Sequence, residues 1–312
     1  MGHEDNFIFH RIWNELSQIN MHKINRVCQW NFQIGLVGSE AVIQDMIEWL
    51  SSFPYHDLEL PVPSNDTVRS NREIMKRLIV VPVAAGEELV GEKLSTADFC
   101  IVETCMVNQV KQLRVDVYPF DRGDKGLAAQ ILANHEGIRF ALSHNFPVFR
   151  PEHAKIEIQD TAVQNAAWVF IAAIPTFLPP PHKAIAAPLA SFADFIVLTV
   201  NEVKLMFELI GLLGEKIQFK HIVEFVFVFG LAKIARGIAG IILTPLPAKT
   251  TLLVKGALAY AFTWAIGEAI VFFIVARQKV GWRFLMQRAK CHYRRGMENS
   301  KEILKKRVLP NT

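Results

Sequence analysis

Phosphate binding is the chemistry that the sequence most nearly offers, at a glycine-containing turn after an apolar run. Residues 32–38 read Phe-Gln-Ile-Gly-Leu-Val-Gly, which is typical of a buried strand ending in glycine. Ser39 can cap the helix that the apolar spacing predicts over residues 40–50. A strand, a glycine turn and a helix N-terminus in this order can hold a phosphate. The candidate nucleotide-binding residues are therefore Gly35, Gly38 and Ser39.

The residues that nucleotide hydrolysis requires are missing from this turn. A P-loop has the pattern GxxxxGK[ST], with lysine on the phosphates and a hydroxyl on magnesium. Counted from Gly35, the last three positions of that pattern fall at residues 40–42, which are Glu, Ala and Val. No aspartate precedes Gly86 to hold the metal, and no Asn-Lys-x-Asp follows a later strand. We therefore assign no catalytic residue and expect neither GTP nor Mg²⁺ as a cofactor. The sequence favours a protein without enzymatic activity over an enzyme.

Histidine and cysteine patterns predict no metal site. His135, His144 and His153 recur every nine residues, a spacing that gives no single helical face, and no HExxH pair occurs. The four cysteines are scattered without a zinc or disulfide pattern, so we expect reduced thiols.

The rest of the chain is organised around a long apolar stretch over residues 161–276. The chain is 51% apolar, with a mean hydropathy of +0.22 and a formal net charge of +4. Prolines and glycines divide the stretch into four predicted helices, at about 161–178, 184–213, 222–243 and 251–276. Spanning a bilayer takes about 20 apolar residues. The last helix is the strongest candidate, because its only charge from Gly256 onwards is Glu268.

Charged residues inside this stretch need partners if it is embedded in a membrane. We expect the bundle to bring together four of them, Asp194, Lys233, Arg236 and Glu268. The expected partner of Glu268 is Lys233 or Arg236, as a structural pair. The alternative is the buried helical core of a soluble protein, with these charges on its wetted rim.

A basic segment follows the last predicted helix, and a positive flank beside a span marks the cytoplasmic side. The residues expected at anionic lipid headgroups are Arg277, Lys279, Arg283, Arg288, Arg294 and Arg295. An even number of spans places both this tail and the N-terminal part in the cytoplasm. The expected partners are membrane lipid and another protein or a second copy of the chain, and not nucleic acid.

Alternating strand and helix patterns predict a three-layer α/β domain with a mostly parallel sheet over residues 30–150. Further strands are expected at 78–83, 99–102 and 115–120, and a helix at 125–133. The predicted domains are a helical arm at 1–29, the α/β domain at 30–150, a four-helix hydrophobic domain at 151–276 and a basic tail at 277–312.

Several stretches resemble a family of bacterial membrane proteins. They are residues 140–150 (FALSHNFPVFR), 161–166 (TAVQNA), the prolines at 179–181, and 193–199 (ADFIVLT). In that family an Era/TrmE-like GTPase domain precedes a hydrophobic helical domain of unknown function. The resemblance covers the second half of the chain, and the first half only by its strand-glycine-helix pattern. It implies a cytoplasmic GTPase-like domain tethered to the inner face of a membrane.

Because the nucleotide motifs are missing, the chain looks like a pseudo-GTPase of this family. Our leading hypothesis is a membrane-anchored scaffold or regulatory protein without catalysis of its own. Two alternatives stay open: a GTP-binding protein or GTPase with an unconventional site at Gly35–Ser39, and a pore-like helical domain gated by the α/β domain.

Overall fold

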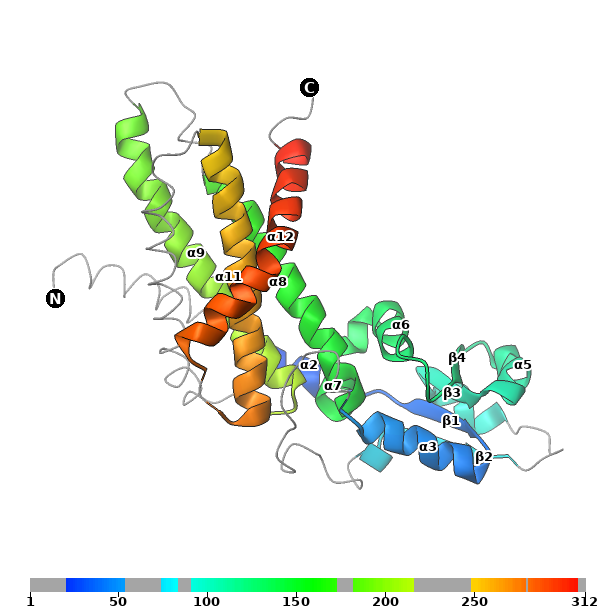
Figure 1. Cartoon of the computed structure of the whole chain (residues 1–312). Helices are drawn as coiled ribbons and strands as arrows, with labels where there is room; N and C mark the ends of the chain where they lie inside the picture. The colour runs from blue at the N-terminus through cyan, green and yellow to red at the C-terminus, as the bar shows by residue number, and fades with distance from the viewer. Residues whose placement is uncertain are drawn as a thin grey trace. The chain divides into compact units, whose positions relative to one another are not determined.

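The computed structural model describes residues 21–53, 74–83, 91–172, 182–215, 248–278 and 280–307 of the 312-residue chain. The chain divides into two compact units (Figure 1). One comprises His22–Ala154 with Gly211–Lys216 and is called the α/β unit; the other comprises Met1–Met21, Lys155–Ile210 and Ile217–Thr312 and is called the helical unit. The predicted third helix, with Lys233 and Arg236, and most of the N-terminal arm lie outside the described residues.

A parallel sheet forms the centre of the α/β unit, as predicted. Its strands are β1 (Ile34–Gly38), β2 (Leu78–Pro82), β3 (Phe99–Glu103) and β4 (Asp116–Phe120). The order across the sheet is β2-β1-β3-β4, and every neighbouring pair is parallel. The four expected strands are thus confirmed, with small changes at their ends. This order puts the topological switch point, where the strand order reverses, between β1 and β3.

Helices cover one face of the sheet. They are α3 (Glu40–Ser51), α6 (Leu127–Asn134), α7 (Arg139–Asn145) and the short turn η7 (Pro147–Phe149). The core between them contains fully buried Leu36, Met46 and Phe99. Trp49 of α3 meets Phe120 and Phe149 edge to face, at centroid distances of 6.0 and 5.9 Å. This apolar face fixes the position of α3, and therefore of its N-terminus.

Short turns cover the opposite face. They are η3 (Gly91–Thr96), η4 (Thr104–Met106), α5 (Val107–Val110) and η5 (Lys111–Leu113). Two further short elements, α2 (Met21–Cys28) and η6 (Glu136–Ile138), belong to the same unit. The core on this side is smaller and centres on Val37, Cys100 and Val102.

Long helices make up the described part of the helical unit. They are α8 (Arg150–Ala172), α9 (His182–Leu212), α11 (Ala248–Ala276) and α12 (Trp282–Arg307). The start of the first hydrophobic helix was predicted wrongly at 161, because α8 begins at Arg150. Pro151 lies in its first turn, where a missing backbone N–H costs nothing, and Ala154 and Ile158 are fully buried.

The basic segment after α11 is a helix that runs back along α11. Arg277 ends α11 in the left-handed region with a φ of 54°, and α12 starts five residues later. Phe284 lies against Phe272, with ring centroids 5.3 Å apart, while Ile303 packs with Leu252 at the opposite end. Most of the predicted basic tail is thus a helix that packs antiparallel to the most apolar helix.

Among the described residues, one helix is long and apolar enough to cross a membrane, namely Thr250–Ala276. Within this helix, 83% of its most apolar window is buried inside the protein. Of the three other predicted hydrophobic helices, α8 and α9 are described and do not meet this criterion, and residues 222–243 lie outside the described part.

Candidate functional site

The carboxyl ends of β1 and β3 form the candidate site. In an open parallel sheet, ligands bind beside the strand ends where the strand order reverses. Here Gly38 ends β1, Ser39 precedes α3, and Glu103 ends the neighbouring strand β3. The structure therefore brings two of the three predicted nucleotide-binding residues to the expected place.

A carboxylate already occupies the N-terminus of α3. The backbone N–H of Ser39 donates a hydrogen bond of 2.7 Å to Oε2 of Glu103. A Cβ on Gly38 would lie 3.0 Å from both the Cβ and Oε2 of Glu103, so glycine allows the close approach of this side chain. Helix N-termini favour negative charge, and here the charge is supplied by the chain itself.

Ser39 occupies the N-cap position of α3 through its backbone only. Its carbonyl accepts the first helical bond, from the N–H of Ile43 at 2.9 Å, whereas its hydroxyl makes no capping bond. The expected capping by the Ser39 side chain is therefore wrong. Glu40 adds a second carboxylate in the first turn. A phosphate at this position would meet two negative charges.

Gly35 lies on the other face of the sheet, away from Gly38. A Cβ at Gly35 would come within 2.5 Å of the Cys100 Sγ and 2.8 Å of a Leu94 methyl group. The packing of the smaller core thus requires a glycine at position 35. Burial raises the pKa of the Cys100 thiol to about 11, so this thiol stays protonated and unreactive.

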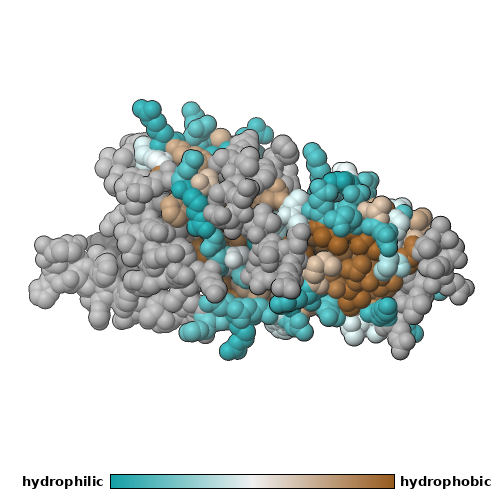
Figure 2. All heavy atoms as spheres, turned by 90° about the horizontal axis from the view of Figure 1, so that it is seen from below, coloured by the Kyte–Doolittle hydropathy of each residue, from teal (hydrophilic) through white to brown (hydrophobic). Residues whose placement is uncertain are grey.

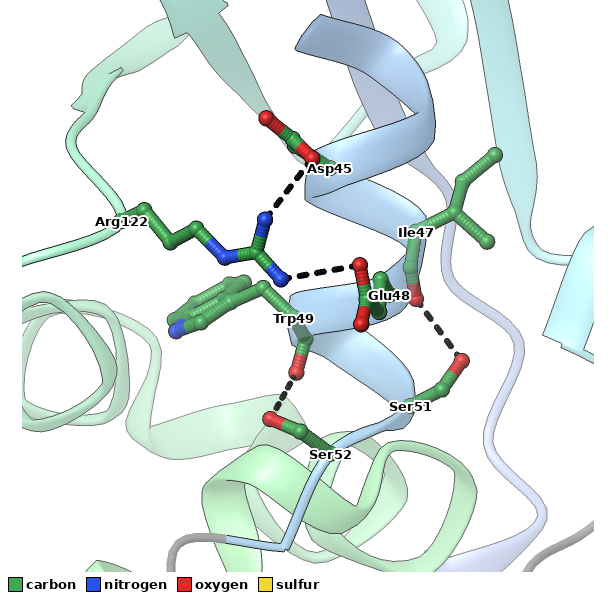
Figure 3. Close-up of polar contacts among 7 residues, drawn as sticks. All are labelled: Asp45, Ile47, Glu48, Trp49, Ser51, Ser52 and Arg122. Carbon is green, nitrogen blue, oxygen red and sulfur yellow. Dashed lines mark hydrogen bonds and ion pairs between the residues drawn. The ribbon is translucent and has the colours of Figure 1, made fainter. Parts of the chain in front are cut away.

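The arginine of the charged turn after β4 pairs with two acidic side chains of α3. Arg122 donates to Asp45 at 3.0 Å and to Glu48 at 2.9 Å, on the outer side of α3 (Figure 3). Asp121 and Asp124 each accept a backbone N–H two residues further on, from Gly123 and Gly126. The two aspartates therefore serve local turn geometry, whereas Arg122 ties the turn to α3. The exposed guanidinium of Arg122 is directed at α3 acids rather than at the switch point.

Each of the three evenly spaced histidines makes its own local contacts. His135 stacks on Phe99 with ring centroids 4.7 Å apart, His144 Nδ1 lies 2.6 Å from the Gly211 carbonyl, and His153 Nδ1 lies 2.9 Å from Ser143 Oγ. Within the described part of the chain, no three His, Cys, Asp or Glu side chains gather as metal ligands would.

Glu268 is the most elaborately paired carboxylate of the helical unit. Its two oxygens accept Nε and Nη2 of Arg288, each at 2.7 Å, and His292 Nε2 lies 3.0 Å from Oε1. The His292 ring in turn stacks on Trp264, with centroids 4.6 Å apart. The partners thus come from α12, and the expected partners Lys233 and Arg236 lie outside the described residues.

The predicted headgroup residues fall into different environments. Arg283, Arg294 and Arg295 are exposed on α12, whereas Arg288 is directed at Glu268 and Arg277 forms the turn before α12. Lys279 and the side chain of Asp194 lie outside the described part of the chain. The amphipathic spacing of residues 282–307 is the sequence signal that could have predicted an inward face on this segment.

A chain of buried and half-buried polar side chains crosses the helical unit, and sequence reasoning missed these contacts. Asn201 of α9 donates to Asn165 of α8 at 2.7 Å, and Asn165 donates to Thr263 of α11 at 2.9 Å. Thr263 then donates to the Ala259 carbonyl at 2.8 Å. Because every link is satisfied, the chain joins three helices without leaving a buried group unpaired.

Comparison of the chain with protein-family models, with curated protein sequences and with solved structures finds no match. The resemblance to GTPase-type membrane proteins therefore stays an expectation of the sequence, and the chemistry of the site has to be argued from its geometry.

Proposed function

We propose that the α/β unit is a non-catalytic, GTPase-like module of a scaffold or regulatory protein. The observation that supports this most directly is the hydrogen bond from the Ser39 N–H to the Glu103 carboxylate. In a nucleotide-binding protein of this topology, a phosphate would use that N–H. A phosphate would have to displace Glu103 from a charge-assisted bond and then share the site with Glu40.

Among the described residues, the positions that a P-loop uses to offset that repulsion carry no free positive charge. Ala41 stands where a P-loop lysine would be, and the described cation near α3, Arg122, is held by Asp45 and Glu48. The described part of the site thus lacks the positive charge that phosphate recognition and transfer require.

A titration of the full-length chain with a fluorescent guanine nucleotide and Mg²⁺ tests this part of the proposal. We expect no saturable binding and no phosphate release. Saturable binding that is lost on Ser39→Pro, which removes the N–H, would establish the alternative of an unconventional nucleotide site. A Gln44→Ala variant on the exposed outer side of α3 is the matched control.

For the helical unit, the proposed role is attachment to the cytoplasmic face of a membrane through the outer face of α12. Exposed basic residues recur on this face at helical spacing. They are Arg283, Lys290, Arg294, Lys301 and Lys305. The exposed acids on α12 are Glu298 and Glu302, which pair with Arg294 and Lys306 along the helix. Such a stripe attracts anionic lipid headgroups by about 1 kcal/mol per basic residue near the surface.

The packing of α12 along α11 favours surface attachment over spanning. If α11 crossed the bilayer in this arrangement, Lys290, Arg294 and Arg295 of α12 would enter the hydrocarbon region with it. Each such charge costs about 3 kcal/mol at the centre of a bilayer. The length and apolar character of Thr250–Ala276 favour the alternative that α11 spans, which requires α12 to leave it.

Alkaline washing of membranes from cells that express the full-length chain separates these two roles. We expect release into the supernatant, followed by binding of the released protein to vesicles that contain phosphatidylserine but not to phosphatidylcholine vesicles. Charge reversal at Lys290, Arg294 and Lys301 should abolish that binding, while reversal of exposed Lys76 and Lys111 of the α/β unit should not. Retention in the washed pellet would show that the chain is integral.

A further inference from the structure

Helix α11 is apolar on every side, so it needs a cover in water. Its apolar residues follow no helical periodicity, and Glu268 is the only charge from Gly256 onwards. A helix of this kind occurs inside a protein or inside a bilayer. Figure 2 views the molecule from below, and in its left half hydrophilic atoms project outward while apolar atoms lie between and behind them. Most of the apolar window of α11 is buried in this arrangement, which keeps it away from water.

Helix α12 supplies one side of that cover (Figure 1). Near the turn between the two helices, Phe284 lies against Phe272 with ring centroids 5.3 Å apart. Towards the other end the two backbones approach closely, since a Cβ on Gly296 would lie 2.6 Å from the Ala257 carbonyl oxygen. The cover therefore extends along most of α11.

The composition of α12 also suits a helix that lies on a membrane surface. Its side towards α11 carries Phe284, Leu285 and Ala289, of which Leu285 and Ala289 are buried. Its outer side carries the basic residues described above. Amphipathic helices with lysine and arginine on one side and aromatic or aliphatic residues on the other lie in the headgroup region of a bilayer. Lipid can therefore replace α11 as the neighbour of the apolar side of α12.

The ion pair of Glu268 determines whether α11 can face lipid. Arg288 and His292, both on α12, are the charged or titratable groups described around this carboxylate. The described polar contacts of α8 with α11 are uncharged, such as the bond from Asn165 to Thr263. An ionised carboxylate is costly in contact with hydrocarbon. The side of α11 that α12 covers can therefore face lipid only when Glu268 carries a proton.

Acid changes these three side chains in the same direction. A proton on Glu268 removes the negative charge that Arg288 and His292 face, and a proton on His292 adds positive charge to α12. Without the Glu268 carboxylate, both cations are attracted to anionic headgroups. Water offers no replacement for the apolar contacts between the helices, so acid without a membrane leaves α12 in place.

We propose that α12 is a cover that opens at an anionic membrane surface in acid. Opening swings α12 about the turn that begins at Arg277, lays its apolar side on the lipid and lets the uncovered side of α11 contact lipid as well. At neutral pH the ionised Glu268 keeps the cover closed, and the chain is attached only through the outer face of α12. This inference rests on the attachment proposed above and adds its regulation.

Spin labels at exposed positions measure the opening from outside the helix contact. Lys255→Cys on α11 and Glu302→Cys on α12 report the separation of the helices, in a background with Cys105 and Cys291 replaced by serine. The vesicles contain phosphatidylglycerol, whose phosphate stays ionised in acid. Between about pH 7.5 and about pH 4 we expect the mean distance to increase by at least one helix diameter, ~10 Å. Without vesicles the distance should be the same at both pH values.

Two variants assign the opening to Glu268, and a second label pair is the control. Glu268→Gln mimics the protonated carboxyl and should open on vesicles already at neutral pH. Glu268→Leu/Arg288→Leu carries no proton at this position and should give the same distance at both pH values. Labels at Gln287→Cys and Glu302→Cys, both on α12, should keep their spacing throughout, because α12 stays a helix.

Flotation of the same samples separates the opening from the attachment. A chain that floats with the vesicles at both pH values but keeps one distance between α11 and α12 would overturn the cover alone. A chain that floats at neither pH would overturn the attachment and the cover with it. An equal increase in acid without vesicles, or a full acid response in Glu268→Leu/Arg288→Leu, would also overturn the proposal.

Discussion

Glu103 and Glu268 are two carboxylates fixed in opposite ways by the two units. Glu103 accepts a backbone N–H that lies next to its own strand in the sheet, and no cation is needed. Glu268 is 6% exposed and is held by the side chains of Arg288 and His292, which approach from another helix. The first arrangement depends on strand register, and the second depends on α12 being folded back on α11.

The difference indicates what each carboxylate is for. A carboxylate at a helix N-terminus stabilises the helix dipole modestly and, in this topology, fills the ligand position. A buried carboxylate with a bidentate arginine contributes little net stability but is costly to separate from its partner. In the proposed function Glu103 therefore closes a nucleotide site, whereas Glu268 is placed to specify which helix lies beside α11.

Removing Glu268 should have the largest effect on stability. Glu268→Ala leaves the Arg288 guanidinium, 20% exposed, without its carboxylate, and should lower the free energy of unfolding by about 3 kcal/mol. Denaturant unfolding followed by circular dichroism measures this. The double variant Glu268→Leu/Arg288→Leu should recover most of the loss, and a double variant as unstable as the single one would contradict the assignment.

Gly35→Ala should have the next largest effect on stability. It measures the contribution of core packing in the α/β unit, apart from the polar contact of Glu103. The new methyl group would overlap the Cys100 side chain, 2.5 Å from its Sγ, and overpacking of this kind costs about 2 kcal/mol. Thermal unfolding measures the change. Combining it with Cys100→Ala should relieve most of the loss, while a fully additive pair would show that the strain lies elsewhere.

Glu103→Ala should cost less, about 1 kcal/mol, because one charge-assisted bond to a half-buried N–H is lost. Glu103→Gln keeps an acceptor and should cost less still. The comparison with Glu268→Ala is the informative measurement. A loss from Glu103→Ala as large as that from Glu268→Ala would mean that Glu103 also organises its unit.

The smallest expected effect is a pH dependence confined to the α/β unit. Burial lowers the pKa of His135 below 6.5, although the carboxylates of Asp116 and Asp98 act in the opposite direction. The unfolded chain therefore binds a proton more readily, so stability falls as pH falls from 6.5 towards the lowered pKa. One proton sets a limit of about 1.4 kcal/mol per pH unit. Denaturant unfolding of His135→Gln should show a flatter dependence over this window.

The pattern of apolar residues along the sequence was enough to predict the strands of the sheet and the most apolar helix. Apolar runs of strand length located β1 to β4, and the long uncharged run located α11. The contacts that define the site depend on register and chain reversal instead. That Glu103 meets Ser39 follows from β3 lying next to β1, and that Arg288 meets Glu268 follows from a turn at Arg277 with a positive φ. Neither fact is encoded in a short motif.

The start of α8 and the Ser39 cap show two further limits. Residues 150–160 are mixed in polarity, so the apolar pattern did not reveal that they continue the helix. Serine before a helix is a common cap, but the Ser39 hydroxyl makes no capping bond, and what the sequence did not reveal is that Glu103 of β3 accepts the backbone N–H of Ser39. In both cases tertiary contacts decided between options that the local sequence left equivalent.

Two polar contacts on α8 limit how the helical unit can change length during evolution. Gln159 accepts the Tyr260 hydroxyl at 2.6 Å, and Asn165 donates to Thr263 at 2.9 Å, so α8 and α11 are joined at two points. A single residue inserted between Gln159 and Asn165 would turn the rest of α8 by about 100°. One of the two contacts would then face away from α11. Insertions should therefore be tolerated at the ends of these helices and rejected between those two positions.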